Sequence, residues 1–391
     1  MKIQTIDIYA LSIPFRVPYR LSKVYGTVTD NHAIVVRLRT EGGLTGWGEA
    51  NPLPPFTEET PSGVVDLLRE VIGPALIGVD AGNIARCRRL IEECVPGNPA
   101  AKGALDMALH DLAGKAVGRP VHALLGGALV DDLGVLWPIG SGTPENDRAL
   151  VDEKRAEGYR TFMVKMGAQP VEVEIERIAA LTERHHPDIQ FIADANQGWR
   201  AAEALRFVDG VNRYPLTLIE QPVDRHDHAG LKRIRAASLA PVSADESVFS
   251  VEQAAELARE RAVDAFSLKV SKNGGIAPTR AIASLAAANG MTCLMNSMLE
   301  CGITQAASLQ LGCTLGNLID CGHAYMSTLR LTDDFTDFGD LVRDGRVRVP
   351  DQPGLGIAVD EAKVAALAQM HGSVGTRPQG APVRSLRGSA A

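Results

Sequence analysis

Five charged residues of this sequence share one setting, because each stands at the end of a short apolar run. They are Lys165, Asp194, Glu220, Asp245 and Lys269, and successive members lie 24 to 29 residues apart. That interval is about the length of one strand, one helix and their loops, so each charge has the same position in its own unit. A buried charge is expensive to remove from water unless something requires it. The spacing therefore indicates a catalytic set and not a solvated helix face.

The three acidic members of this set predict a metal site. Asp194, Glu220 and Asp245 come from consecutive strand candidates, and no histidine or cysteine accompanies them. Such an all-oxygen site suits Mg²⁺, with Mn²⁺ as the alternative metal. We expect no organic cofactor, because no G-x-G-x-x-G motif follows a first strand and no glycine-rich phosphate loop follows the last strands.

The two basic members suggest proton transfer. Lys165 and Lys269 fall on the second and sixth of eight strand candidates, which lie across the mouth from each other in a closed barrel. A substrate carboxylate on the metal would then have one lysine near each face of its α-carbon. Removal of the α-proton leaves an enediolate, whose charge a metal stabilises. A lysine whose pKa is lowered by burial and by the cation can act as the base.

The elements that must position these residues follow a regular rhythm. Most of the apolar strand candidates are separated by amphipathic, alanine- and glutamate-rich helical segments, which is typical of a (β/α)8 barrel. A doubly wound sheet is the structural alternative, although its glycine-rich fingerprint is absent. The eight strand candidates are residues 135–142, 161–167, 189–195, 216–222, 241–247, 265–270, 292–298 and 315–321.

The first ~125 residues have a different pattern. Residues 32–50 alternate between apolar and polar side chains and are broken at Gly42-Gly43, which predicts antiparallel hairpins. Residues 60–78 and 98–118 have helical periodicity. Strands followed by helices predict a small α+β unit.

Composition excludes several classes of partner. The formal net charge is −7 and no lysine/arginine run stands out, so we expect neither nucleic acid nor an anionic membrane as a partner. No apolar stretch approaches the roughly 20 residues of a membrane span, and the N-terminus lacks signal-peptide features. The six cysteines have no metal-ligand spacing, which is typical of reduced thiols in a cytoplasmic protein.

These motifs resemble the enolase superfamily, and within it the muconate lactonizing subgroup of the mandelate racemase/muconate lactonizing enzyme family. The resemblance covers nearly the whole chain. It rests on ALDMALHDLAGKAVGRPVHALLGG (104–127), DANQ (194–197), EQP (220–222), ADES (244–247) and LKVSKNGG (268–275).

The resemblance implies an α+β capping domain over a modified TIM barrel of (β/α)7β type. It also implies Mg²⁺ on Asp194, Glu220 and Asp245, with Lys165 and Lys269 as the acid/base pair. We expect a small-molecule carboxylate as substrate and a homo-oligomer, either a dimer or an octamer. The expected divisions are 1–127 for the capping domain, 128–355 for the barrel, and 356–391 for a C-terminal segment that returns to the cap and ends in a loose tail after about residue 372.

This sequence departs from the family pattern at three places. The Lys-x-Lys of strand two is Met163-Val164-Lys165 here, so the first lysine is lost. Either the substrate carries its own positive charge, or the site tolerates the loss. Strand seven has Asn296 where the racemase subgroup has a histidine, which fits the two-lysine subgroup. Strand eight has only Asp320 of the Asp-x-Asp pair found in dipeptide epimerases, which speaks against a standard dipeptide.

Further residues are candidates for supporting roles. Asn196 and Glu246 are expected to contact the metal ligands from behind. We expect His323 to be structural and Lys272 to support the loop after strand six. The candidates for substrate binding are Tyr25, Phe56, Met163, Asn296, Glu300, Asp320 and Tyr325.

The sequence predicts a Mg²⁺-dependent enzyme that abstracts a proton α to a carboxylate. Racemisation or epimerisation of an amino-acid derivative is favoured, with an N-substituted amino acid, a proline betaine-like compound or a dipeptide as substrate. Muconate-type cycloisomerisation and acid dehydration use the same intermediate and remain alternatives. A catalytically silent protein that binds small acids is the non-enzyme alternative, although binding alone needs no base.

Overall fold

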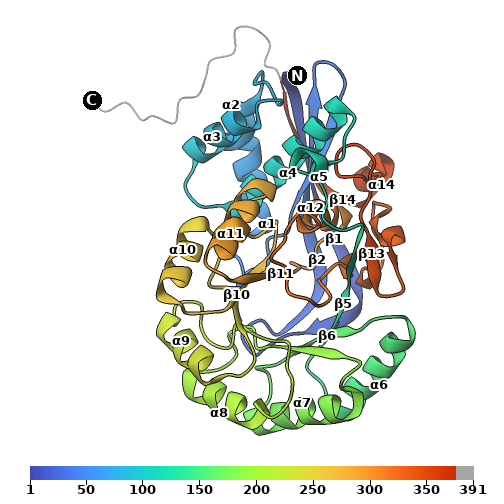
Figure 1. The fold of residues 1–391 in the computed structure, drawn as a ribbon. Coiled ribbons are helices and arrows are strands. Elements are labelled where there is room, and N and C mark those ends of the chain that lie inside the picture. The colour runs from blue at the N-terminus through green and yellow to red at the C-terminus, as the bar shows by residue number, and fades with distance from the viewer. Residues whose placement is uncertain (376–391) are drawn as a thin grey trace.

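The structure is a computed structural model that describes residues 1–375. Two sheets organise this part of the chain. A four-stranded antiparallel sheet combines strands from both ends of the chain, and a seven-stranded parallel sheet comes from its middle. The antiparallel sheet and its helices form a cap, and the parallel sheet forms the barrel (Figure 1).

The cap sheet has the strand order β14-β1-β2-β3. Its strands are β1 (Ile3–Arg20), β2 (Thr27–Thr40), β3 (Thr45–Ala50) and β14 (Ala368–Gly375). The predicted hairpin at 32–50 is formed by β2 and β3. The end of the chain was expected to be loose after about residue 372, but residues up to 375 pair with β1. The rest of that expectation falls on residues 376–391, outside the described residues.

The cap helices cover one face of this sheet. They are α1 (Pro61–Leu67), a π-helix (Leu68–Ile72), α2 (Gly73–Leu76), α3 (Ile84–Cys94), α4 (Pro99–Val117) and α5 (Val121–Leu124). The central helix α4 is buried along most of its length. It lies directly on β3, because a Cβ at Gly48 would be 1.8 Å from the carbonyl oxygen of Ala104. Gly48 thus permits a close approach that a side chain would prevent.

The barrel sheet runs in the order β11-β10-β9-β8-β7-β6-β5, with all neighbours parallel. Helices α6 to α11 follow one another in an outer arc around it (Figure 1). The strands are β5 (Leu136–Ile139), β6 (Thr161–Lys165), β7 (Gln190–Asp194), β8 (Leu218–Glu220), β9 (Val242–Ala244), β10 (Ala265–Leu268) and β11 (Thr292–Met295). The helices are α6 (Pro144–Ala156), α7 (Val171–His185), α8 (Ala201–Val211), α9 (His228–Ala237), α10 (Val251–Glu260), α11 (Ile276–Ala288) and α12 (Gly302–Gly312).

The eighth strand position is filled by a short irregular segment. Leu318 forms a parallel bridge with Cys293 of β11, and His323 forms one with Val135 beside β5. These two bridges close the barrel. The amide of Ala324 donates to the carbonyl of Met295, the last residue of β11, at 2.9 Å. The end of this segment that lies level with the carboxyl ends of the other strands is therefore near residue 324. The predicted strand at 315–321 ends several residues earlier.

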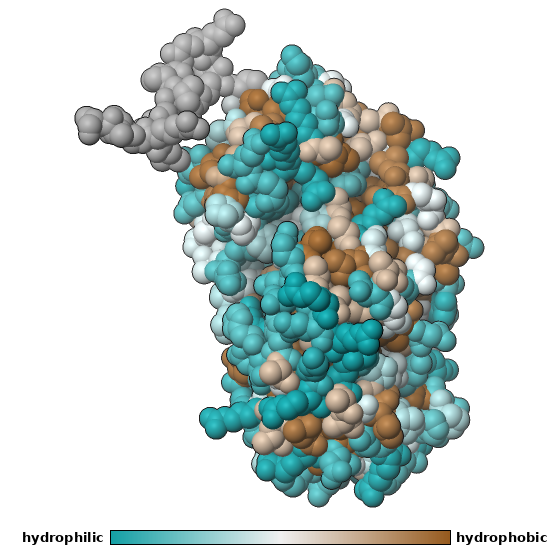
Figure 2. Space-filling model, turned by 60° about the vertical axis from the view of Figure 1, so that its left-hand side comes forward, coloured by the Kyte–Doolittle hydropathy of each residue, from teal (hydrophilic) through white to brown (hydrophobic). Residues whose placement is uncertain are grey.

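Short elements complete the described chain. They are β4 (Asp132–Gly134), α13 (Ser327–Arg330), a 3₁₀ helix (Phe338–Leu341), β12 (Val342–Arg343), β13 (Arg346–Arg348) and α14 (Glu361–Leu367). No helix among residues 1–375 is long and apolar enough to cross a membrane. On the face drawn in Figure 2, hydrophobic residues form small groups among hydrophilic ones.

A buried carboxylate joins the cap to the barrel. Glu49, near the end of β3, accepts hydrogen bonds from the amides of Cys301 at 2.7 Å and Thr304 at 3.0 Å. These amides belong to the first turn of α12, where free N–H groups and the helix dipole favour a negative charge. Burial nevertheless raises the pKa of Glu49 to about 7. The contact fixes the cap relative to the loop after β11.

A buried ion pair holds the strand end that carries Lys165. Arg177 of α7 is fully buried and donates to Asp147 Oδ2 at 2.7 Å. The same guanidinium donates to the carbonyl of Lys165 at 2.8 Å and to that of Gly140 at 3.2 Å. It thereby satisfies backbone acceptors just beyond β5 and at the end of β6.

We predict that Arg177→Met destabilises the protein by about 3–5 kcal/mol, because it leaves the Asp147 carboxylate buried and unpaired. The free energy of unfolding in urea measures this effect. Adding Asp147→Leu should recover part of the loss, since the uncompensated charge is then removed.

Arg184→Met is the matched control, because Arg184 pairs with Asp152 at 2.7 Å on the surface of the same helix. Its cost should stay below about 1 kcal/mol. Equal losses in the two variants would contradict a special role for Arg177.

Candidate active site

The five charged residues singled out from the sequence meet at the carboxyl ends of the barrel strands. Lys165, Asp194 and Glu220 are the last residues of β6, β7 and β8. The parallel register places Lys165 beside Asp194, and Asp194 beside Glu220. Asp245 and Lys269 directly follow β9 and β10. All five are at most 7% exposed, so they face one another inside the protein.

Ion pairs connect four of these residues. The Lys165 ammonium contacts Asp194 Oδ2, and Lys269 Nζ contacts Asp245 Oδ2 at 2.6 Å. A third buried lysine, Lys272, contacts Asp245 Oδ1 at 2.8 Å and also donates to the carbonyl of Asp245 at 2.6 Å. Lys272 also donates to the carbonyl of Ser267 in β10 at 3.0 Å, so it joins β9 to β10, whereas the sequence led us to expect support of the loop after strand six.

Glu220 lies between the two aspartates and forms no ion pair with a basic residue of the described chain. Its Oε1 accepts a hydrogen bond from the amide of Asn296 at 2.8 Å. Its Oε2 is buried and has no hydrogen-bond partner among the described residues. Burial, followed by the charges of Asp194 and Asp245, raises the pKa of Glu220 well above its ordinary value. The nearby lysines therefore compensate the negative charge of Glu220 only in part.

The nearby carboxylates raise the pKa values of both catalytic-site candidate lysines, Lys165 and Lys269. Burial lowers the pKa of Lys165, but the charges of Asp194 and Glu220 and the hydrogen bond to Asp194 outweigh burial and leave its pKa above the ordinary value. Lys269 behaves in the same way, with Asp245 as its main partner. The pKa of Asp245 is depressed, because Lys269 and Lys272 outweigh its burial.

The three strand-end carboxylates do not gather as tightly as metal ligands do. Among the described residues, the histidine and acidic ligand atoms that lie within 4.8 Å of one another belong to His228, Glu256 and Glu260. These residues lie on α9 and α10, outside the barrel mouth. Asp194 and Asp245 each contact a lysine instead.

A small cavity of about 40 Å³ adjoins both lysines. Met163, Asn196 and Asn296 contribute to its wall from the barrel. Met163 lies on the same face of β6 as Lys165, two residues earlier. The cap contributes Tyr25 and Phe56, as the sequence predicted, and also Tyr19 and Leu53, which the sequence analysis did not single out.

Tyr25 and Phe56 cover this cavity from the cap side. The Tyr25 hydroxyl donates to Glu246 Oε1 at 3.0 Å and accepts from the amide of Gln197. The ring centroid of Phe56 lies 4.3 Å from Lys269 Nζ, and Arg225 donates to the carbonyl of Phe56 at 2.9 Å. The cap loops are thus in a closed arrangement over the charged residues.

Asn196 and Glu246 lie behind the carboxylates, as their positions in the sequence suggested. The Asn196 amide N–H donates to Asp194 Oδ1 at 2.9 Å, and its side chain donates to Glu246 Oε1 at 3.4 Å. Burial, followed by the charges of Asp245 and Asp194, raises the pKa of Glu246 to about 8.

Three predicted substrate-binding residues do not line the cavity. Glu300 is buried in the loop after β11, where it accepts hydrogen bonds from Ser297 and Gln305. Tyr325 is buried against α12 and donates to the carbonyl of Ser308 at 3.2 Å. Asp320 is exposed at the opposite end of the barrel. The cause for Asp320 and Tyr325 is the register of the closing segment, whose residue Met326 reaches the cavity instead.

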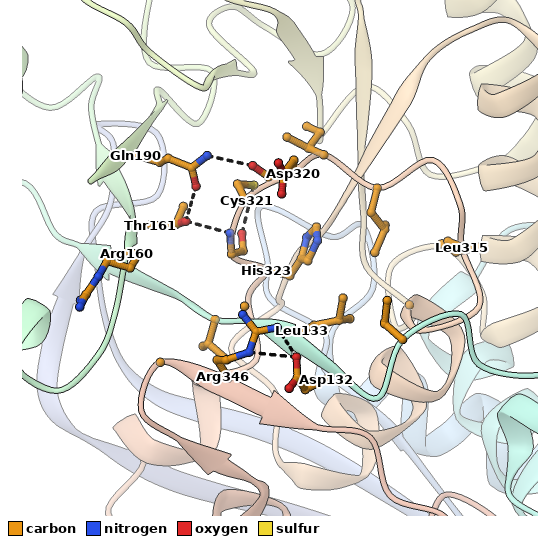
Figure 3. Close-up of a pocket in the computed structure, with 18 of the residues that line it drawn as sticks. Asp132, Leu133, Arg160, Thr161, Gln190, Leu315, Asp320, Cys321, His323 and Arg346 are labelled. Carbon is orange, nitrogen blue, oxygen red and sulfur yellow. Dashed lines mark hydrogen bonds and ion pairs between the residues drawn. The ribbon is translucent and has the colours of Figure 1, made fainter. Parts of the chain in front are cut away.

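Figure 3 shows where Asp320 lies. It borders a hollow of about 660 Å³ near the first residues of β6 and β7, Thr161 and Gln190. Gln190 donates to the carbonyl of Asp320 at 2.8 Å. His323 lines the same hollow, and burial lowers its pKa to about 4, which agrees with the expected structural role. This hollow is larger than the closed cavity but holds none of the five charged residues.

Comparisons with known proteins cover almost the whole chain. Residues 4–126 match the family "Mandelate racemase / muconate lactonizing enzyme, N-terminal domain". Residues 146–363 match the family "Enolase C-terminal domain-like".

Similar proteins include two enzyme types. The chain is 32% identical to chloromuconate cycloisomerase of Pseudomonas putida over 93% of this chain and 98% of that protein. It is 31% identical to L-Ala-D/L-Glu epimerase of Bacillus subtilis over 91% of this chain and 97% of that protein. The structure of N-succinyl Arg/Lys racemase from Bacillus cereus superposes with a TM-score of 0.91 at 30% identity, over 96% of this chain and 100% of the other. The chain therefore belongs to the mandelate racemase/muconate lactonizing enzyme family of the enolase superfamily, and it is an enzyme of the isomerase or lyase type.

Proposed function

We propose that this enzyme removes and returns the proton on the carbon next to a carboxylate, and that it racemises or epimerises an amino-acid derivative. One observation carries the proposal. Two buried lysines, at the ends of β6 and β10, stand four sheet positions apart on either side of three buried carboxylates. In a barrel of eight positions, these strands lie opposite each other. Binding alone would need no such pair of bases.

The residues present fit a divalent cation. The candidate ligands Asp194, Glu220 and Asp245 offer only carboxylate oxygens, which Mg²⁺ prefers and Mn²⁺ also accepts. Glu220 Oε2 is buried without a partner, and the raised pKa of this carboxyl reflects uncompensated negative charge. A bound cation would satisfy both and would stabilise negative charge on the substrate carboxylate.

The two lysines would do the proton transfer. Lys165 Nζ would take the α-proton from one face, and Lys269 Nζ would deliver a proton to the other. Their pKa values are held above the ordinary value by the carboxylates they contact. A divalent cation shared by those carboxylates would cancel much of this field and lower the pKa of both lysines, which favours the neutral base.

The cap would keep water away from the carbanionic intermediate. Tyr25 and Phe56 close the cavity over both lysines, and a volume of about 40 Å³ holds no substrate of amino-acid size. We infer that the cap loops move aside when substrate enters and close again around it. Closure then strengthens the electrostatic contacts inside the site.

The second candidate reaction is cycloisomerisation of a muconate-type acid. It uses the same intermediate, and the chain is about as similar to chloromuconate cycloisomerase as to the epimerase and the racemase. A base on each side of the substrate is required for inversion at carbon, whereas cycloisomerisation requires one acid. This difference favours the racemase.

We predict that Asp194→Asn, Glu220→Gln and Asp245→Asn each weaken Mg²⁺ binding and lower turnover at least about a hundredfold, since each removes a fixed charge from the site. Isothermal titration with MgCl₂ measures the binding, and Mn²⁺ should replace Mg²⁺. Asp209→Asn on the exposed face of α8 is the control and should change neither. Full activity after complete chelation would refute the metal.

We predict that Lys165→Ala and Lys269→Ala each abolish racemisation but leave exchange of the α-proton in opposite enantiomers. Each variant retains one base, so it can still serve one face of the carbon. NMR in D₂O, with a library of N-substituted amino acids of known configuration, separates the two activities. Lys232→Ala on the surface of α9 is the control. If both lysine variants racemise normally, the two-base mechanism is wrong.

A further inference from the structure

The cavity beside Lys165 has an apolar wall on one side. On another side, a positively charged residue lies behind an aromatic ring that borders the cavity. Met163 occupies the position next to Lys165 on the same face of β6, and it is apolar and buried. Tyr19, from the end of β1 in the cap, borders the same cavity. Behind Tyr19 lies Arg330, the last residue of α13.

Arg330 is a half-buried arginine whose guanidinium packs against aromatic rings. Its guanidinium carbon lies 3.9 Å from the ring centroid of Tyr19 and 5.7 Å from that of Phe15. Its Nη1 is buried without a hydrogen-bond partner, and Arg330 forms no ion pair with any carboxylate of residues 1–375. Stacking on two aromatic rings compensates only part of the cost of burying such a charge.

Tyr19 places an unused hydrogen-bond donor in front of this cation. Its hydroxyl is buried and has no partner among the described residues. Its ring centroid is 6.0 Å from Lys165 Nζ. Burial raises the pKa of Tyr19, so the phenol keeps its proton and can donate it to an acceptor.

A single kind of ligand would satisfy both groups. An anionic oxygen in the cavity would accept from the Tyr19 hydroxyl and would lie in the field of the Arg330 guanidinium. A cationic substituent would instead lie near that guanidinium and both lysines. The two carboxylates of the cluster that have no lysine partner among the described residues, Glu220 and Glu246, already accept hydrogen bonds from Asn296 and Tyr25.

We propose that Tyr19 and Arg330 form a specificity subsite that selects substrates with a second, anionic oxygen group, so that Arg330 supplies from α13 the positive charge absent at Met163. Tyr19 touches the substrate, and Arg330 acts through Tyr19 as a positioning residue. The proposal rests on the proposed function and names its substrate class. The enzyme is specific for N-acyl amino acids whose acyl group ends in a carboxylate, and it disfavours betaines.

The test compares three derivatives of one amino acid: N-succinyl (anionic), N-acetyl (neutral) and N,N,N-trimethyl (cationic). Wild-type enzyme with Mg²⁺ should exchange the α-proton in D₂O with kcat/KM falling in that order. Tyr19→Phe and Arg330→Met should each lower kcat/KM for the N-succinyl compound by about tenfold to a hundredfold, mainly through KM, and change the N-acetyl value little. A preference of the wild type for the betaine, or equal losses on all three compounds, would overturn the subsite.

Two further variants separate charge from packing. Arg330→Lys keeps the charge and should keep the order of preference. Met163→Lys in the Arg330→Met background should restore part of the N-succinyl activity, because it returns a cation to the same wall. Arg16→Met on the exposed face of β1 is the matched control, with unchanged values expected. If neither charge-bearing variant differs from Arg330→Met, a charge role for Arg330 is wrong.

A binding measurement keeps the subsite testable without turnover. Succinate should raise the melting temperature of the wild type more than it raises that of Tyr19→Phe or Arg330→Met, and glycine betaine should not. Absence of α-proton exchange in the wild type would overturn the proposed reaction alone, because the succinate shift still decides the subsite. Equal succinate shifts in all three proteins would overturn the subsite and leave the reaction standing.

Discussion

At the carboxyl ends of β6 to β10, four buried carboxylates lie beside three buried lysines. The carboxylates are Asp194, Glu220, Asp245 and Glu246, and the lysines are Lys165, Lys269 and Lys272. Two carboxylates have lysine partners, whereas Glu220 and Glu246 have raised pKa values. Such a concentration of charge is destabilising away from water unless each charge is compensated. The folded barrel can hold it only because the parallel register brings opposite charges together. The proposed cation would contact the unpaired oxygen of Glu220.

The cap depends on the same end of the barrel. Glu49 of β3 binds the first turn of α12, and α4 packs directly on β3. This anchoring brings the ends of β1 and the loop after β3 over the charged residues. Tyr25 and Phe56 can then close the cavity, although each lies more than a hundred residues from the lysines in sequence. The barrel supplies the charged residues, and the cap covers them.

The proposed selection of substrate charge takes place at the boundary between these two parts. Met163 leaves this part of the barrel wall uncharged. The Arg330 guanidinium, which stacks on Phe15 and Tyr19, brings a positive charge close to the same cavity. The ring of Tyr19 separates the guanidinium from the cavity, so the cation acts at short range without contacting Lys165. In the proposed subsite, the positive charge comes from an element that follows the last strand and not from the strands that carry the two lysines.

The sequence by itself determined the strand ends that carry Lys165, Asp194, Glu220, Asp245 and Lys269. Each of these residues ends an apolar run that local pattern alone identifies as a strand. The spacing of one βα unit was then enough to predict that the strand ends meet. The ligand and base roles assigned to them remain predictions. Only the tertiary structure decided the position of the closing segment, because its register depends on bridges from Leu318 to Cys293 and from His323 to Val135. With these bridges, Asp320 lies at the end of the barrel opposite the charged residues, and Tyr325 packs against α12. The contact between Tyr19 and Arg330 could not be predicted from the sequence either. The two residues are more than three hundred positions apart, and no periodic sequence pattern indicates which distant side chains pack together.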